Sequence, residues 1–113
     1  MHELGIVRNI VAIVGDAANG RRVRRVTLEV GKLTGVMTDA IMFCFETVAQ
    51  GTLLEGAALE IRQIEGRARC QTCGLEFAAA TLFTPCACGS RQNQRLRGEE
   101  LNIKSMELEV EVA

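Results

Sequence analysis

The chain has 113 residues, 48% of them hydrophobic and 24% charged, which is enough to bury a core but too few for two full-sized domains. Thirteen basic and fourteen acidic side chains give a formal net charge of -1, which argues against nucleic acid or an anionic membrane as the main partner. The longest apolar run, residues 40–45, is far shorter than a bilayer span, so we expect a soluble, cytoplasmic protein.

The first half of the chain predicts a helix, a strand and a second helix. Apolar residues at helical spacing over 4–17 predict a helix with a wide, largely buried apolar face, ended by Asn19-Gly20. Alternation over 25–30 predicts a strand. Thr38 and Asp39 are candidate caps of a second helix, whose inner face carries Ile41, Cys44, Phe45 and Val48.

Two further strands are predicted in the second half. Residues 59–62 alternate, and near the end of the chain Met106, Leu108, Val110 and Val112 alternate with a polar row that holds three glutamates. This glutamate row can lie opposite Arg25 or Arg62 on a neighbouring strand. The pattern predicts an α+β fold, with a small antiparallel or mixed three-stranded sheet and two helices.

A zinc-ribbon-like module is predicted as an insertion into this fold. Residues 66–94 are rich in cysteine and glycine and lack long periodic patterns. We therefore expect one domain from 1–65 and 95–113, and a zinc-binding domain from 66–94 that is too short to bury a sizeable core alone.

Four of the five cysteines lie within this insertion, at Cys70, Cys73, Cys86 and Cys88, with Gly74 and Gly89 directly after each pair. Such turns present two thiolates each, and four thiolates complete the closed tetrahedral shell of a structural zinc site. Iron-sulfur ligation stays open from spacing alone, although the turns do not match common ferredoxin runs. A thioredoxin-like redox pair is disfavoured because no βαβ pattern precedes Cys70.

The single histidine, His2, stands next to the first residue. Initiator methionine is normally trimmed only before a small residue, so we expect Met1 to stay. The Met1 amine, the backbone nitrogens of His2 and Glu3, and the His2 imidazole can then chelate one Ni(II) or Cu(II) ion in square-planar geometry, which zinc does not prefer. An exposed histidine without a ligand role is the alternative.

Several motifs together resemble the HypA/HybF family. They are an initial Met-His-Glu-Leu, Arg-Val-Thr-Leu-Glu-Val-Gly-Lys-Leu at 25–33, Phe-Cys-Phe-Glu at 43–46, Cys-Gly-Ser at 88–90, and a closing Glu-Leu-Asn-Ile-Lys-Ser-Met-Glu at 100–107. Met1, His2 and Glu3 match the nickel motif of the family, and Cys70, Cys73 and Cys88 match its zinc ligands. Cys86 departs from the family's Cys-Pro-x-Cys order, because Pro85 precedes it here.

The resemblance implies a nickel metallochaperone for [NiFe]-hydrogenase maturation, not an enzyme. It implies Ni(II) as cargo, structural Zn(II), a GTPase partner (HypB), delivery to a hydrogenase large-subunit precursor, and a possible homodimer. A zinc-ribbon module that binds nucleic acid is the alternative, supported by arginines flanking the cysteines but opposed by the balanced charge. An enzyme is disfavoured because one histidine gives no Ser-His-Asp set and the zinc shell is closed.

Overall fold

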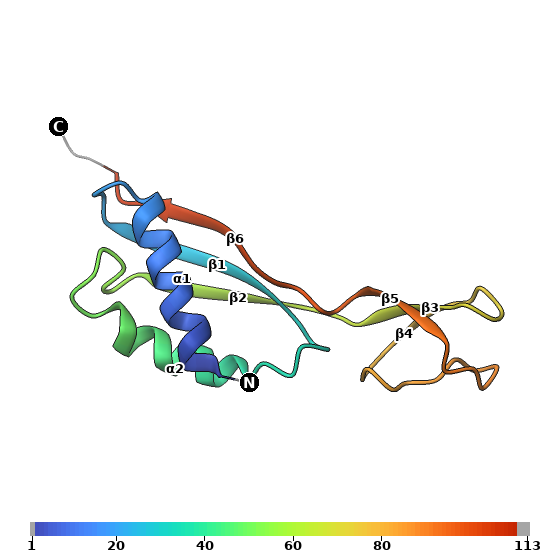
Figure 1. The fold of residues 1–113 in the computed structure, drawn as a ribbon. Helices are drawn as coiled ribbons and strands as arrows, with labels where there is room; N and C mark the ends of the chain where they lie inside the picture. The colour runs from blue at the N-terminus through green and yellow to red at the C-terminus, as the bar shows by residue number, and fades with distance from the viewer. Residues whose placement is uncertain (1, 111–113) are drawn as a thin grey trace. The chain divides into compact units, whose positions relative to one another are not determined.

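A computed structural model describes residues 2–110 and shows two helices and two three-stranded sheets (Figure 1). The sheet orders are β2-β1-β6 and β4-β3-β5. The elements are α1 (Glu3–Ala17), β1 (Val23–Gly31), α2 (Thr38–Ala49), β2 (Ala58–Ile64), β3 (Arg67–Cys70), β4 (Glu76–Ala78), β5 (Asn93–Arg97) and β6 (Leu101–Leu108). The predicted α+β class, with two helices, a three-stranded sheet and an inserted cysteine module, is confirmed.

The chain folds into two compact units. The first contains both helices, and the second comprises residues 29–35 and 63–101, which include the small sheet and four cysteines. Neither helix within residues 2–110 has the length and apolarity needed to cross a bilayer. The domain boundaries suggested by the sequence stay a prediction.

The first sheet is mixed. Hydrogen bonds join Glu109 N–H to Arg22 O at 2.9 Å and Gly31 N–H to Glu100 O at 2.7 Å, so β6 runs antiparallel to β1. Strands β1 and β2 run in the same direction (Figure 1). A parallel pair needs a crossover connection, and the segment that contains α2 provides it.

Helix α1 is less buried than its sequence predicts. Its buried stripe is Val7, Ile10, Val11 and Val14. Leu4 and Ile13 are instead 44% and 58% exposed, so the apolar face of the helix extends beyond the part that is packed. The end of the helix is as predicted, because Asn19 and Gly20 both take positive φ angles, 53° and 84°.

Helix α2 buries the predicted face but is capped differently. Ile41 and Phe45 are buried, and Cys44 and Val48 are half-buried. Thr38 and Asp39 do not cap it: Met37 is the N-cap residue, and no side chain of the cap position hydrogen-bonds the helix. A carboxylate from α1 binds at this helix start instead, as described below.

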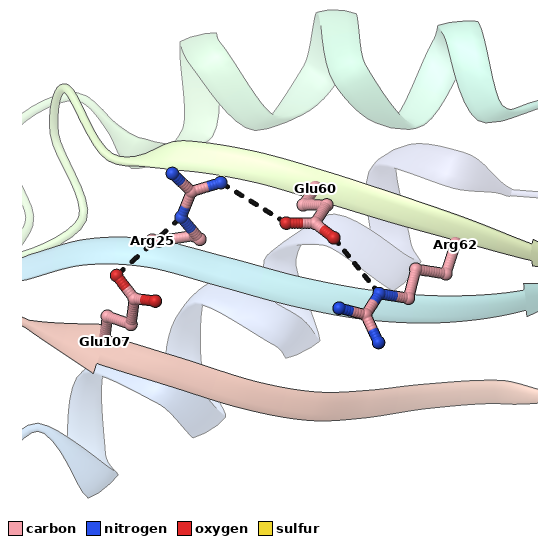
Figure 2. Close-up of polar contacts among 4 residues, drawn as sticks. All are labelled: Arg25, Glu60, Arg62 and Glu107. Atoms are coloured by element: carbon pink, nitrogen blue, oxygen red, sulfur yellow. Dashed lines mark hydrogen bonds and ion pairs between the residues drawn. The ribbon is translucent and has the colours of Figure 1, made fainter.

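A row of alternating charges crosses the first sheet (Figure 2). Arg25 on β1 lies 3.3 Å from Glu60 on β2 and 3.7 Å from Glu107 on β6, and Glu60 also lies 3.1 Å from Arg62. The predicted cross-strand pairing of the closing glutamates with Arg25 is thus confirmed for Glu107. These side chains remain partly exposed, so solvent screens each pair and its contribution to stability is small.

Strand β6 ends earlier than the alternation predicts. Its last residue is Leu108, and Val110 is 78% exposed rather than part of a buried row. Val112 lies outside the described residues.

Three glycines allow close backbone contact in the second unit. A Cβ on Gly31 would stand 2.0 Å from the carbonyl oxygen of Gly98, and one on Gly66 would stand 2.2 Å from that of Ala79. Leu33 lies against both Gly66 and Gly98 and is itself buried. Any larger residue at 31 or 66 would have to move backbone, which fixes the path of the chain here.

Candidate metal centre

The first cysteine pair is held in a tight turn at the end of β3. Gly74 N–H donates to Cys70 O at 2.9 Å, and the positive φ of Gly74, 79°, closes the turn. Cys73 N–H is directed at Cys70 Sγ at 3.4 Å. The backbone therefore directs the positive end of an N–H dipole at the sulfur of Cys70, which stabilises the thiolate form of that side chain.

The second pair forms a shorter turn of the same kind. Cys86 N–H donates to Ser90 O at 3.0 Å, and Gly89 N–H donates to Cys86 O at 2.8 Å. This second hydrogen bond spans three residues, whereas the corresponding bond from Gly74 to Cys70 spans four. Gly89 has φ 89°. This tighter closure explains how a Cys-x-Cys pair, which departs from the Cys-x-x-Cys spacing of the first turn, still brings both sulfurs to one place.

Hydrogen bonds join the two turns. Gln71 N–H donates to Gln92 O at 2.8 Å, and the hydroxyls of Thr72 and Ser90 lie 2.9 Å apart. These four residues are not ligands, and the spacing of the cysteines gives no sign of their role. The serine after Cys88-Gly89 is the one feature in the sequence that points to this contact.

The four sulfurs lie within 4.8 Å of one another. Sγ of Cys70 is 3.7 Å from that of Cys88, and Sγ of Cys73 is 3.6 Å from that of Cys86. A regular tetrahedron with metal–sulfur bonds of about 2.3 Å has edges of about 3.8 Å, so the donor set fits a tetrahedral metal such as zinc. Cys86 takes its place in the cluster despite its shifted position in the sequence.

The four thiols differ in burial, and the two buried ones have opposite pKa shifts. Cys70 and Cys86 are buried, while Cys73 and Cys88 are exposed. Hydrogen bonds, of which the one from the Cys73 N–H has the largest effect, outweigh desolvation and lower the pKa of Cys70 to about 6. The Cys88 N–H also acts to lower the pKa of Cys86, but desolvation and the neighbouring sulfurs outweigh it and raise that pKa to about 12. A divalent cation that binds all four sulfurs must displace the remaining protons.

The predicted N-terminal site is described only in part. Met1 lies outside the described residues. His2 is exposed, directly precedes α1, and makes no side-chain cap hydrogen bond. Its imidazole is therefore not used to build the core or to cap the helix.

Glu3 has a role that the sequence analysis missed. Its Oε2 accepts a hydrogen bond from Met37 N–H at 3.1 Å, which links the starts of α1 and α2. This hydrogen bond is the main cause that lowers the pKa of Glu3. A contact between residues 34 positions apart leaves no local signal in the sequence.

The fifth cysteine, Cys44, is half-buried on the inner face of α2 and is not part of the sulfur cluster. Its place between Phe43 and the buried Phe45 agrees with the packing role predicted for it.

Comparison with known proteins gives one family. The model for "Hydrogenase/urease nickel incorporation, metallochaperone, hypA" matches residues 1–108. Relatives named hydrogenase maturation factor HypA include one from Trichormus variabilis, 56% identical over 96% of both chains. Another, from Geobacter metallireducens, is 49% identical over 96% of this chain and all of the relative.

Solved structures agree at the level of the fold. The solution structure of the Ni metallochaperone HypA from Helicobacter pylori has a TM-score of 0.68 with this chain, covering 98% of it and all of the other chain. A second solution structure, of HypA protein, has a TM-score of 0.71 and covers 98% of both chains. Both are 24% identical to this chain, so the likeness extends to the fold alone.

Proposed function

This chain belongs to the HypA family, and we propose that it carries Ni(II) to the large-subunit precursor of a [NiFe]-hydrogenase during maturation. The observation that carries the proposal is the family match over 1–108, in a chain whose first residues are Met1, His2 and Glu3. The family acts in nickel incorporation, as a metallochaperone rather than a catalyst. Nickel is the cargo, and zinc is the resident metal of the cysteine cluster.

The cysteine cluster supports a structural role for zinc. Four sulfurs leave no open position in a tetrahedral shell, and an open position is what zinc chemistry on a substrate needs. The ion would be held by the four clustered cysteines and would cross-link the two turns that carry them. These cysteines are Cys70, Cys73, Cys86 and Cys88. The hydrogen bonds between the turns then fix one arrangement of the surrounding surface.

The nickel ligands proposed are the Met1 amine, the backbone nitrogens of His2 and Glu3, and the His2 imidazole. The exposed imidazole of His2 supports this set, since no helix cap or core contact holds it. The first N–H groups of a helix have no intrahelical acceptor, so metal binding at residues 2 and 3 does not break the hydrogen-bond ladder of α1. The Glu3 carboxylate already accepts from Met37, which favours its backbone nitrogen as the ligand.

Release is as important as binding for a carrier. Square-planar nitrogen coordination favours Ni(II) over Zn(II), while a chain end can exchange its ligands one at a time with an acceptor. We propose that the GTPase HypB supplies or accepts Ni(II), that the protein acts in the cytoplasm, and that it can form a homodimer. Nickel content of a purified hydrogenase precursor, measured with and without HypB and GTP, tests the delivery step.

A Ni(II) titration tests the binding site directly. Zinc-loaded protein with an unblocked Met1 amine is compared with His2→Gln, whose large second residue also keeps Met1, by calorimetry and visible absorption at a pH of about 7.5, where free imidazole is mostly neutral. We expect saturable binding with a square-planar absorption band, lost in His2→Gln while zinc content is unchanged. Glu3→Gln, which keeps the backbone nitrogen, is expected to retain the band.

The pH dependence tests the same ligand set. Histidine side chains and α-amines have reference pKa values of about 6.5 and about 7.7 to 8.0, and both groups must lose a proton to bind. Ni(II) affinity is therefore expected to fall as the pH is lowered from 8 to 6. Equal binding by His2→Gln, or an affinity that stays constant over this range, would show that nickel binds elsewhere.

A further inference from the structure

The cysteine-containing unit has a cavity of about 90 Å³ on one face of its sheet, here called the side pocket. Residues that pair directly across two strands share a face, and Ala68 on β3 pairs with Arg95 on β5. Both line the side pocket, together with Phe83, Thr84, Arg91 and Asn93 among others. The cysteine cluster and this cavity therefore belong to the same small module.

The wall formed by residues 81–84 is ordered by its own hydrogen bonds. Thr81 N–H donates to Thr84 Oγ1 at 3.0 Å, and Phe83 N–H donates to Thr81 Oγ1 at 3.1 Å. Asn93 Nδ2 donates to Thr84 O at 3.3 Å and fastens this segment to β5. A wall that is already formed loses little conformational entropy when a ligand binds.

One buried acceptor on β5, beside the side pocket, has no donor. Asn93 Oδ1 is the buried side-chain oxygen that lacks a hydrogen-bond partner within residues 2–110. Because Asn93 Nδ2 binds a carbonyl, exchanging the two amide atoms would place two acceptors together, so the orientation is fixed.

The charge around the side pocket is positive. Residues 67–97 include five arginines but one acidic side chain, Glu76. Glu76 lies 3.6 Å from Arg69, and Arg95 pairs with Glu99. Arg91 has no ion-pair partner in the part of the chain that the structure describes. The lining of the side pocket, which includes Arg91 and Arg95 and no acidic side chain, is thus complementary to an acidic ligand.

Apolar side chains stand at the same place. Phe83 is 78% exposed and Leu82 is 47% exposed, and both line the side pocket. Aromatic and arginine side chains next to one another are typical of the centres of protein–protein interfaces. A ligand that carries both an apolar group and a carboxylate would contact both kinds of side chain.

We propose that the side pocket docks an extended acidic segment of a partner protein, with an apolar side chain against Phe83 and a carboxylate at Arg91. The apolar rim formed by Leu82 and Phe83, in a chain of formal net charge -1, favours a polypeptide over nucleic acid. This interaction goes beyond nickel carriage and does not depend on the N-terminal nickel ligands.

An NMR titration of the full zinc-loaded chain tests the proposal. The probe is an end-capped eight-residue peptide of alternating glutamate and leucine, and the control peptide has lysine in place of glutamate. We expect saturable shifts of the Asn93 side-chain amide and the Phe83 backbone amide with the acidic peptide alone. Arg91→Glu should weaken binding about tenfold or more, Arg91→Lys should retain most of it, and Phe83→Ser should weaken it too.

Arg97→Glu is the matched control, because Arg97 is also an exposed arginine of β5 but does not line the side pocket. It changes the net charge equally and should leave most of the affinity. The proposal is overturned by the absence of saturable shifts at millimolar peptide, by equal binding of the lysine peptide, or by equal loss in both glutamate variants. Tighter, salt-sensitive binding of a single-stranded oligonucleotide at these signals would overturn it in favour of nucleic acid. Unchanged Ni(II) binding by Arg91→Glu separates this outcome from any failure of the nickel site.

Discussion

The two compact units are held together by different means. The first buries large aliphatic and aromatic side chains from α1, β1 and α2, such as Val14, Leu28, Ile41 and Phe45. In the described residues of the second, the buried apolar side chains are Val30, Leu33, two alanines and two of the clustered cysteines. A core that small gives little hydrophobic stabilisation, so we propose that a metal ion at the cysteine cluster takes over the role that side-chain packing has in the first unit.

Removal of the metal should separate the two units most strongly. Structural zinc in small modules contributes apparent free energies of about 10 to 16 kcal/mol at neutral pH, and those modules unfold without it. For Cys70→Ser or chelated protein we expect loss of amide-exchange protection in β3 and β5, while α1 and β1 remain protected. Cys44→Ser should keep its metal, because Cys44 is not in the cluster. Loss of protection throughout the chain would contradict the contrast between the units.

A cavity in the first unit tests the other half of the comparison. Leu28 is 1% exposed, and truncation of a buried leucine costs about 2 to 5 kcal/mol. Leu28→Ala should lower the free energy of unfolding by that amount in denaturant titrations without changing metal content. Ile13→Ala, at a position 58% exposed, is the control and should stay within about 0.5 kcal/mol of the parent.

In both units, the sequence predicts the local features better than the long-range contacts. The periodic apolar residues predict both helices, β1 and the buried face of α2. The paired cysteines and the glycines that follow them predict the cysteine cluster. Each of these signals lies within a few residues of the chain. The contacts it missed are long-range: Glu3 with Met37, and Thr72 with Ser90. The exposure of Ile13 also escaped it, since periodicity shows which residues share a face but not how far a neighbouring element extends.

The glycine contacts offer a smaller and more local test of the second unit. Gly31→Ala would place a Cβ 2.0 Å from the Gly98 carbonyl oxygen, and overpacking of this kind costs about 1 to 3 kcal/mol. Thermal unfolding should show this loss. Gly5→Ala is the matched control, since no atom lies within 4 Å of its added Cβ, and in a helix it should stabilise by about 0.5 to 1 kcal/mol. Equal effects of both changes would mean that the backbone at Gly31 has room to move.

The smallest effect is expected from the charge row on the first sheet, which adds to a unit already held by its core. A hydrogen bond from Arg62, followed by the charges of Arg62 and Arg25, lowers the pKa of Glu60 below the usual 4.5. The folded state therefore holds this proton less tightly than the unfolded state, and the contribution of Glu60 to stability is complete above pH 4.5 and is lost as the pH falls through the lowered value. An NMR titration of the Glu60 carboxyl should give a higher pKa in Arg62→Gln than in the parent. Arg24→Gln, which removes an exposed arginine from outside the row, should leave that titration unchanged. Identical titrations of Glu60 in the parent and in Arg62→Gln would show that the contact in Figure 2 does not persist in solution.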